Sequence, residues 1–116
     1  MMSSEKKLRM SIDAKRYTIY IGKEVIRQLD NPSYVSLLVN QHTIAVIPCD
    51  ENHVLPFQVP EEMEGQGRMR IYSTSFIRSL CIEHRLDENR SYVLNGTYHP
   101  DIAAVVFNLP HSKSYS

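Results

Sequence analysis

The segment RYTIYIGKEVIRQL occupies residues 16–29, and a second segment, RMRIYSTSFIRSL, occupies residues 68–80. Landmarks recur in the same order in the two parts of the chain: Ile19-Tyr20 with Ile71-Tyr72, Ile26-Arg27-x-Leu29 with Ile77-Arg78-x-Leu80, Ser33-Tyr34-Val35 with Ser91-Tyr92-Val93, and Ile44-Ala45 with Ile102-Ala103. An ordered series of matches is difficult to obtain by chance. We therefore interpret the chain as an internal duplication.

The first copy predicts a strand, a short helix and a hairpin. Residues 16–21 alternate and are rich in β-branched and aromatic side chains, which favour a half-buried strand. Residues 23–30 carry apolar side chains at helical spacing. Asn31-Pro32 ends this helix, because proline cannot donate a backbone hydrogen bond and disfavours helical geometry in the residue before it. Strands at 34–40 and 43–49 then complete the unit.

The second copy predicts the same order of elements. Ser73 or Thr74 is suited to cap a helix that begins at Ser75, because both side chains carry a hydroxyl acceptor. The apolar stripe of this helix comprises Phe76, Ile77, Leu80 and Cys81. Strands expected at 91–98 and 102–109 close the second unit.

The fold class that these patterns indicate is α+β, mostly β, in a single domain covering residues 1–116. A unit of about 40 residues is too small to bury a stable core alone, so two units are expected to cover each other around a pseudo-two-fold axis. Further strands at 8–12 and, as a possible strand, at 54–59 would make each unit β-β-α-β-β. The first repeat then spans 8–49, an acidic linker spans 50–67, and the second repeat spans 68–109.

The charges are unevenly distributed although the net charge is zero. Residues 1–29 hold seven Lys and Arg against three acidic residues, a net charge of +4. Residues 30–67 hold no Lys or Arg and six acidic residues, and residues 68–116 hold six basic against four acidic residues. Either these charges are scattered over the surface, or a basic N-terminal face opposes an acidic linker. The second arrangement would suit nucleic acid, because phosphate contacts supply most of the binding affinity.

The stretch IGKEVIRQL at residues 21–29 resembles the strand-to-helix turn of the AbrB-like swapped-hairpin DNA-binding proteins, the SpoVT/AbrB and MazE relatives. The resemblance covers residues 8–49 once and 54–109 again. It implies a barrel that two interlocking chains usually form, here written as one polypeptide. The turn Asp13–Arg16 is basic, as that family's DNA-binding role would require, whereas its counterpart at 60–68 contains three glutamates.

The resemblance and the charges together predict a small DNA-binding regulator of bacterial or phage origin, with double-stranded DNA as its partner. The residues expected to contact DNA are Lys15, Arg16, Arg68 and Arg70, helped by Lys6, Lys7 and Arg9. A solvated strand end is the alternative explanation of this cluster. The competing function is a protein-interaction or inhibitory factor from a mobile element, which would use its acidic segment to bind a partner protein.

Nothing in the sequence indicates an enzyme or a cofactor, since glycine-rich phosphate loops and HExxH or GxSxG patterns do not occur. Cys49, His53, Cys81 and His84 could in principle form a zinc tetrahedron, but a small buried cysteine explains Cys81 better. No apolar run is long enough to cross a bilayer, and the lysines near the N-terminus precede no apolar segment. With two cysteines, the chain is expected to be cytoplasmic and to make no membrane contact.

Overall fold

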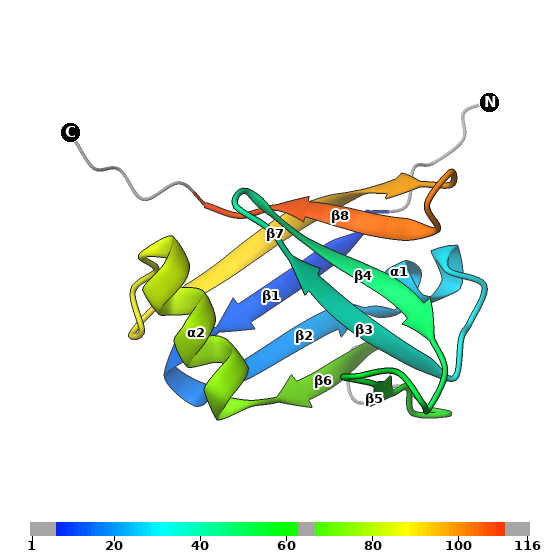
Figure 1. The fold of residues 1–116 in the computed structure, drawn as a ribbon, viewed down its shortest axis with the longest axis horizontal. Helices are drawn as coiled ribbons and strands as arrows, with labels where there is room; N and C mark the ends of the chain where they lie inside the picture. Colours follow the sequence, from blue (N-terminus) through cyan, green and yellow to red (C-terminus); the bar gives the residue numbers. More distant parts are fainter. Residues whose placement is uncertain (1–6, 63–66, 111–116) are drawn as a thin grey trace.

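The computed structural model describes residues 7–62 and 67–110. Its elements follow one another as β1 (Arg9–Asp13), the 3₁₀ turn η1 (Ala14–Arg16), β2 (Thr18–Gly22), α1 (Lys23–Gln28), β3 (Tyr34–Val39), β4 (Thr43–Cys49), β5 (Phe57–Gln58), β6 (Arg68–Tyr72), α2 (Thr74–His84), β7 (Ser91–His99) and β8 (Ala104–Asn108) (Figure 1). The expectation of a mostly β fold with two helices is therefore confirmed.

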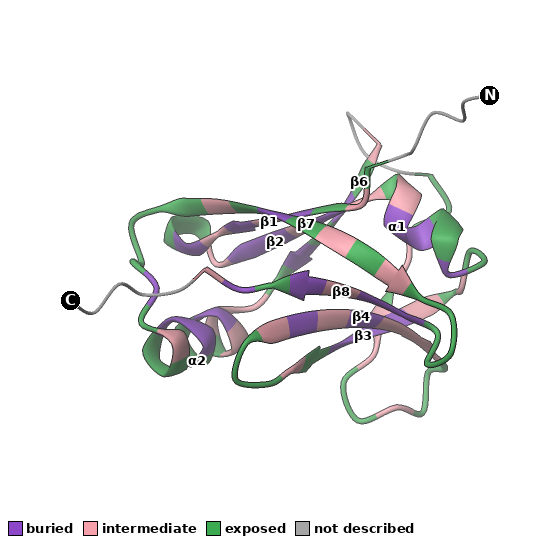
Figure 2. Ribbon diagram, turned by 90° about the horizontal axis from the view of Figure 1, so that it is seen from above, coloured by how far each residue is buried: buried purple, intermediate pink, exposed green. Residues whose placement is uncertain are grey.

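The eight strands form one antiparallel sheet in the order β5-β3-β4-β8-β7-β1-β2-β6. The sheet curls until its edge strands β5 and β6 lie at the same side of the molecule, which gives a nearly closed barrel (Figure 1). Seen from above, β7, β1 and β2 lie over β8, β4 and β3, with buried positions between the two layers (Figure 2). Fully buried side chains from both layers, among them Ile12, Ile19, Val46 and Phe107, fill this interior.

The two helices lie at opposite ends of the barrel (Figure 1). Helix α1 buries Val25 and Ile26 at one end, and α2 buries Ile77, Leu80 and Cys81 at the other. Since the side chains of both helices belong to the same hydrophobic cluster as the strands, the helices close the ends of a single core.

The N-terminal end of α2 is capped by one of the two residues that the sequence predicts, and the helix begins one residue earlier than expected, at Thr74. The Ser73 hydroxyl accepts a hydrogen bond from the Phe76 backbone amide at 3.3 Å, so serine rather than Thr74 caps the helix. At the other end Arg85 adopts a left-handed conformation, and the Leu86 amide donates to the Cys81 carbonyl at 3.0 Å. Leu86 is buried, which fixes the chain as it turns toward β7.

Strand β7 belongs to both halves of the sheet. Its residues Ser91–Asn95 pair with β1, whereas Gly96–His99 pair with β8. At the change of partner, the Gly96 amide donates to the Leu8 carbonyl at 2.7 Å. The side of Gly96 where a side chain would stand is filled by the Phe107 ring, whose Cε2 lies 2.6 Å from an ideal Cβ position. Glycine is therefore required for β7 to cross the core at this point.

Several predicted boundaries are wrong. The strand expected at 16–21 begins only at Thr18, because Arg16 belongs to the turn η1 and Tyr17 has a left-handed φ of 53°. The strand expected at 54–59 is reduced to Phe57–Gln58, because the Ser36 hydroxyl donates to the Leu55 carbonyl at 2.8 Å and holds this segment across β3. Residues 102–103 lie in the turn before β8, where Ala103 has a left-handed φ of 51°. Helix α1 ends at Gln28, two residues earlier than expected.

The downstream sequence matches do not occupy equivalent positions. Val35 is fully buried whereas Val93 is exposed, and Ile44 is fully buried whereas Ile102 lies exposed in a turn. Tyr92 packs against the core, opposite buried Ile12, while Tyr34 precedes inward-facing Val35 and so points to the outside of the sheet. Side chains alternate along a strand, so a shift of one residue between the copies reverses the faces.

Neither of the two helices in the described residues has the length and apolar character needed to span a membrane.

Candidate nucleic-acid interface

Strands β7, β1, β2 and β6 share one solvent-facing surface, and their registers fix which side chains stand side by side on it. Val93 lies opposite Ser11, Ser11 opposite Tyr20, and Tyr20 opposite Arg70. Two further rows of cross-strand partners run in the same direction on either side of this one. One row consists of Asn95, Arg9, Gly22 and Arg68, and the other of Ser91, Asp13, Thr18 and Tyr72. Residues far apart in the chain thus form a continuous outer surface.

Strand β6 supplies most of the charge of this surface. Met69 and Ile71 are buried, so the intervening residues Arg68, Arg70 and Tyr72 point outward. Strand β1 adds Arg9, which is exposed next to buried Met10. We call the surface formed by Arg9, Tyr20, Arg68, Arg70 and Tyr72 the basic face.

Two tyrosines on the basic face are presented differently. The Arg68 guanidinium carbon lies 3.9 Å from the centre of the Tyr20 ring, close enough for a cation–π contact. The Tyr72 side chain is 68% exposed, and its hydroxyl accepts a hydrogen bond from Thr74 Oγ1 at 3.3 Å. The first tyrosine therefore forms a stacked pair with arginine, while the second offers most of its surface to solvent.

The structure brings together three of the seven residues expected to contact DNA, namely Arg9, Arg68 and Arg70. Lys15 and Arg16 belong to the turn η1 before Thr18, whereas Arg68 pairs with Gly22 at the other end of β2. Lys7 precedes β1 and lines a surface depression of about 590 Å³ with Gln28. Lys6 lies outside the described residues.

The two turns considered as a common DNA face lie at opposite ends of the β2–β6 pair. The turn Asp13–Arg16 leads into Thr18, which faces Tyr72, whereas the segment before Arg68 reaches the Gly22 end. Arg16 is exposed and its guanidinium lies 3.1 Å from the Asp13 carboxylate. The turns therefore do not converge, and Glu64 of the acidic turn lies outside the described residues.

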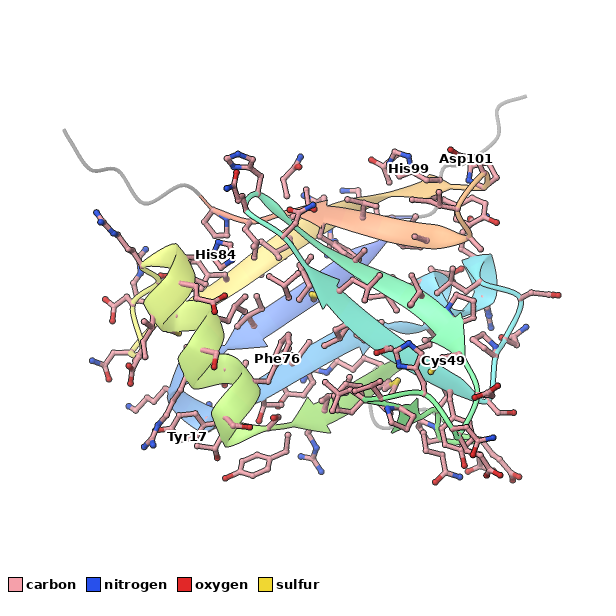
Figure 3. The ribbon with its side chains drawn as sticks, viewed as in Figure 1. Tyr17, Cys49, Phe76, His84, His99 and Asp101 are labelled. Carbon is pink, nitrogen blue, oxygen red and sulfur yellow. The ribbon has the colours of Figure 1, made fainter. Side chains whose placement is uncertain are left out.

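Tyr17 follows turn η1 at the border of the basic face (Figure 3), and Arg78 of α2 contacts it. Tyr17 has a left-handed φ of 53°, and its hydroxyl accepts a hydrogen bond from Arg78 at 3.5 Å. This hydrogen bond raises the pKa of Arg78 above its usual value. Arg27 makes an ion pair with Glu24 at 3.2 Å, so the arginines of both helices are engaged in contacts within the protein.

Sequence reasoning did not assign Tyr72 to the site, although a signal was present. The alternation Arg-Met-Arg-Ile-Tyr at residues 68–72 places Tyr72 on the same side as both arginines. That Arg9 of β1 and Tyr20 of β2 lie beside these residues follows only from the register of the sheet.

The cysteines and histidines considered for zinc are not gathered into a metal site. No three His, Cys, Asp or Glu residues within 7–62 and 67–110 are arranged to hold a metal ion. Cys49 and His84 lie at opposite ends of the molecule (Figure 3). Burial, followed by the nearby acidic residues, raises the pKa of both thiols, which disfavours the nucleophilic thiolate.

A comparison of the chain with protein-family models, with curated proteins and with solved structures finds no match.

Proposed function

We propose that this protein binds nucleic acid and that the basic face is the contact surface. The observation that carries the proposal is the segregation of strand-borne charge. All three Lys or Arg residues that lie in the described strands, Arg9, Arg68 and Arg70, stand on this face. Strands β5, β3, β4 and β8 carry none. Arginine is well suited to phosphate, because its guanidinium is always charged and can donate two parallel hydrogen bonds.

The acidic residues are separated from the strand-borne arginines along the chain. Asp50, Glu51, Glu61 and Glu62 are all exposed in the segment that connects β4 with β6, and residues 30–67 contain no Lys or Arg. None of these four carboxylates stands on a strand of the basic face. An uneven distribution of charge biases the orientation in which a polyanion first meets a protein.

We expect the double charge reversal Arg68→Glu with Arg70→Glu to reduce affinity for a labelled mixed-sequence oligonucleotide, tested single-stranded and as a duplex. The loss should be on the order of a hundredfold at low salt, because two phosphate contacts are replaced by two repelling carboxylates. Wild-type affinity should fall with salt, with a log–log slope of about −2 to −3 for three contacts. Fluorescence anisotropy measures both quantities.

The matched control is the double reversal Arg85→Glu with Arg90→Glu. It changes the net charge equally, but both residues are exposed in the connection between α2 and β7, off the basic face. If both double variants lost the same affinity, the loss would be explained by net charge alone, and the assignment of the basic face as the contact surface would be contradicted. Absence of binding to either oligonucleotide by the wild-type protein would refute the function.

The swapped-hairpin architecture expected from the sequence is a further part of the proposal, and the strand order supports it. The β7–β8 hairpin of the second unit lies between β4 and β1 of the first. When the edge strands β5 and β6 are counted as neighbours, the eight strands form a ring. If each strand of the first unit is replaced by its counterpart in the second and vice versa (β1 with β5, β2 with β6, β3 with β7, β4 with β8), every strand keeps the same pair of neighbours in this ring. The first unit thus contributes the hairpins β1–β2 and β3–β4, and the second contributes the hairpin β7–β8 together with the two edge strands β5 and β6.

Two strand pairs lie where the pseudo-two-fold axis would pass. In β2–β6, Ile19 faces its counterpart Ile71, and Tyr20 and Tyr72 lie on either side of this pair. In β4–β8, Ala45 faces Val106, with a buried residue of each strand on both sides. If Ala45 and Val106 are counterparts, equivalent residues of the two copies are 61 positions apart. The sequence match of Ile44 with Ile102 assumed a separation of 58 positions.

Binding of a partner protein remains the second candidate function, and one observation favours it. In the β4–β5 connection, which begins with Asp50 and Glu51, Val54 is 97% exposed and Leu55 is also exposed. We expect Val54→Asp to abolish recovery of a partner in a pull-down, because the partner would bury this side chain. Ile102→Asp, which alters another exposed isolated apolar residue, should leave recovery unchanged. Equal recovery by both variants and the wild type would contradict this function.

A further inference from the structure

We propose that the nucleic acid bound by the basic face is single-stranded, with its bases stacked on Tyr72 and on the Arg68–Tyr20 pair. This inference rests on the proposed function and specifies its ligand. It differs from the expectation of double-stranded DNA, and it follows from the shape of the surface and from the exposure of its aromatic side chains.

The shape of the basic face does not match a DNA groove. The residues of the basic face stand on three adjacent strands, β1, β2 and β6, which are about 4.8 Å apart, so the outer strand axes are separated by about 10 Å. The major groove is only about 12 Å wide and admits a helix or a two-stranded ribbon. Because the side chains widen the surface beyond the strand axes, three adjacent strands do not fit into the groove together. A single strand can lie across them without this restriction.

A duplex backbone can use only the hydroxyl of an exposed tyrosine, whereas unpaired bases can also use the face of its ring. Tyr72 is more than two-thirds exposed and stands next to Arg70 along β6. A base with a free face can stack on such a ring, and this interaction tolerates any sequence. In a duplex each base is already stacked between its neighbours, so the ring would remain unused.

The Arg68–Tyr20 pair supplies a second planar surface. The guanidinium lies over the ring at 3.9 Å, which holds the arginine plane in place before a ligand arrives. Bases stack on arginine planes as they do on aromatic rings. Tyr20 faces Arg70 across the strands, so Tyr72 is its diagonal neighbour, about 7–8 Å away between Cα positions. The two platforms are therefore placed to receive successive bases of one strand, and the positive charges of Arg9 and Arg70 on the same face attract its phosphates.

The test compares oligothymidine and oligouridine of about 12 nucleotides with a mixed-sequence duplex of equal length, each labelled and titrated with the full chain. We expect both single strands to bind more tightly than the duplex. Tyr72→Ala should weaken single-strand binding roughly 5- to 150-fold, the effect of losing one stacked base. Tyr72→Phe, which keeps the ring and removes the hydroxyl, should restore affinity. The two single strands distinguish DNA from RNA as the source of the ligand.

The control variant removes a tyrosine that does not belong to the basic face. Tyr34→Ala removes a tyrosine from the outer side of β3, in the half of the sheet whose strands carry no basic residue, and should leave affinity unchanged. Duplex binding that is tighter than single-strand binding, yet lost in Arg68→Glu with Arg70→Glu, would overturn the inference while leaving the proposed function intact. Unchanged single-strand affinity in Tyr72→Ala would overturn the stacking. Absence of binding to all three probes would overturn both.

Discussion

Replacing Ile77 with alanine is expected to destabilise the protein by about 2–5 kcal/mol, the range for removing a large aliphatic side chain from a packed core. Ile77 is 1% exposed and lies on the face of α2 that closes one end of the barrel. The loss combines the transfer of the removed methyl groups with the cavity left behind, which the sheet cannot fill without changing its curvature. Urea denaturation should show a lower midpoint with an unchanged slope.

Ile82 provides the matched control on the same helix. Its side chain is 73% exposed, so Ile82→Ala should change the free energy of unfolding by no more than about 0.5 kcal/mol. Alanine is also the better helix former, which works in favour of the variant. Similar losses at both positions would show that α2 does not dock through the face that contains Ile77.

The orientation of α2 could be predicted from the sequence because its signal is local. Helical spacing selects Phe76, Ile77, Leu80 and Cys81, and the last three are buried while Phe76 is partly buried. The capping serine follows from the same few residues. Such features depend on side chains within one or two turns, so no knowledge of the rest of the chain is needed.

The relation between the two hairpins could not be predicted, because it depends on register across the whole sheet. The matched tripeptides at 33–35 and 91–93 suggest that Val93 repeats Val35, whereas Leu94 is the buried residue on β7. A difference of a single residue in the connection before the hairpin reverses which side chains face inward. Sequence identity between the two tripeptides therefore predicted a strand in both places, but it pointed to Val93 rather than Leu94 as the buried residue.

The candidate site shows the same division between local and non-local information. Alternation along β6 is sufficient to place Arg68 and Arg70 on one side of the strand. That Arg9 and Tyr20 stand beside them follows only from the pairing of β1, β2 and β6, and the separation of Lys15 from Arg68 follows from the antiparallel direction of β2 and β6. Proximity in the sequence thus predicted the composition of the basic face less well than the pairing of the strands does.

Serine at position 96 is expected to destabilise the protein by about 1–3 kcal/mol, or more if the ring has no alternative position. Any Cβ at this position would lie 2.6 Å from Phe107 Cε2 and 2.9 Å from two further ring carbons. Phe107 is fully buried, so the ring cannot move outward without displacing its neighbours. The bend in β7 would open instead, and the strand would lose part of its pairing with β1 or β8. Thermal unfolding should show the lower stability directly.

The same substitution at Gly22 should have the opposite sign, which separates a steric effect from a general cost of serine. An added Cβ at Gly22 meets only the Arg9 carbonyl oxygen, at an ordinary 3.5 Å. Gly22 stands at the N-cap of α1 with extended dihedral angles and no side-chain cap. A serine hydroxyl at this position can accept a hydrogen bond from a backbone amide of the first turn, which stabilises the helix by a few tenths of a kcal/mol.

In the Gly96→Ser background, Phe107→Leu should cost less than it does in the wild type, because the smaller side chain relieves the clash. Independent, additive losses would mean that the Phe107 ring is not what requires glycine at the bend of β7.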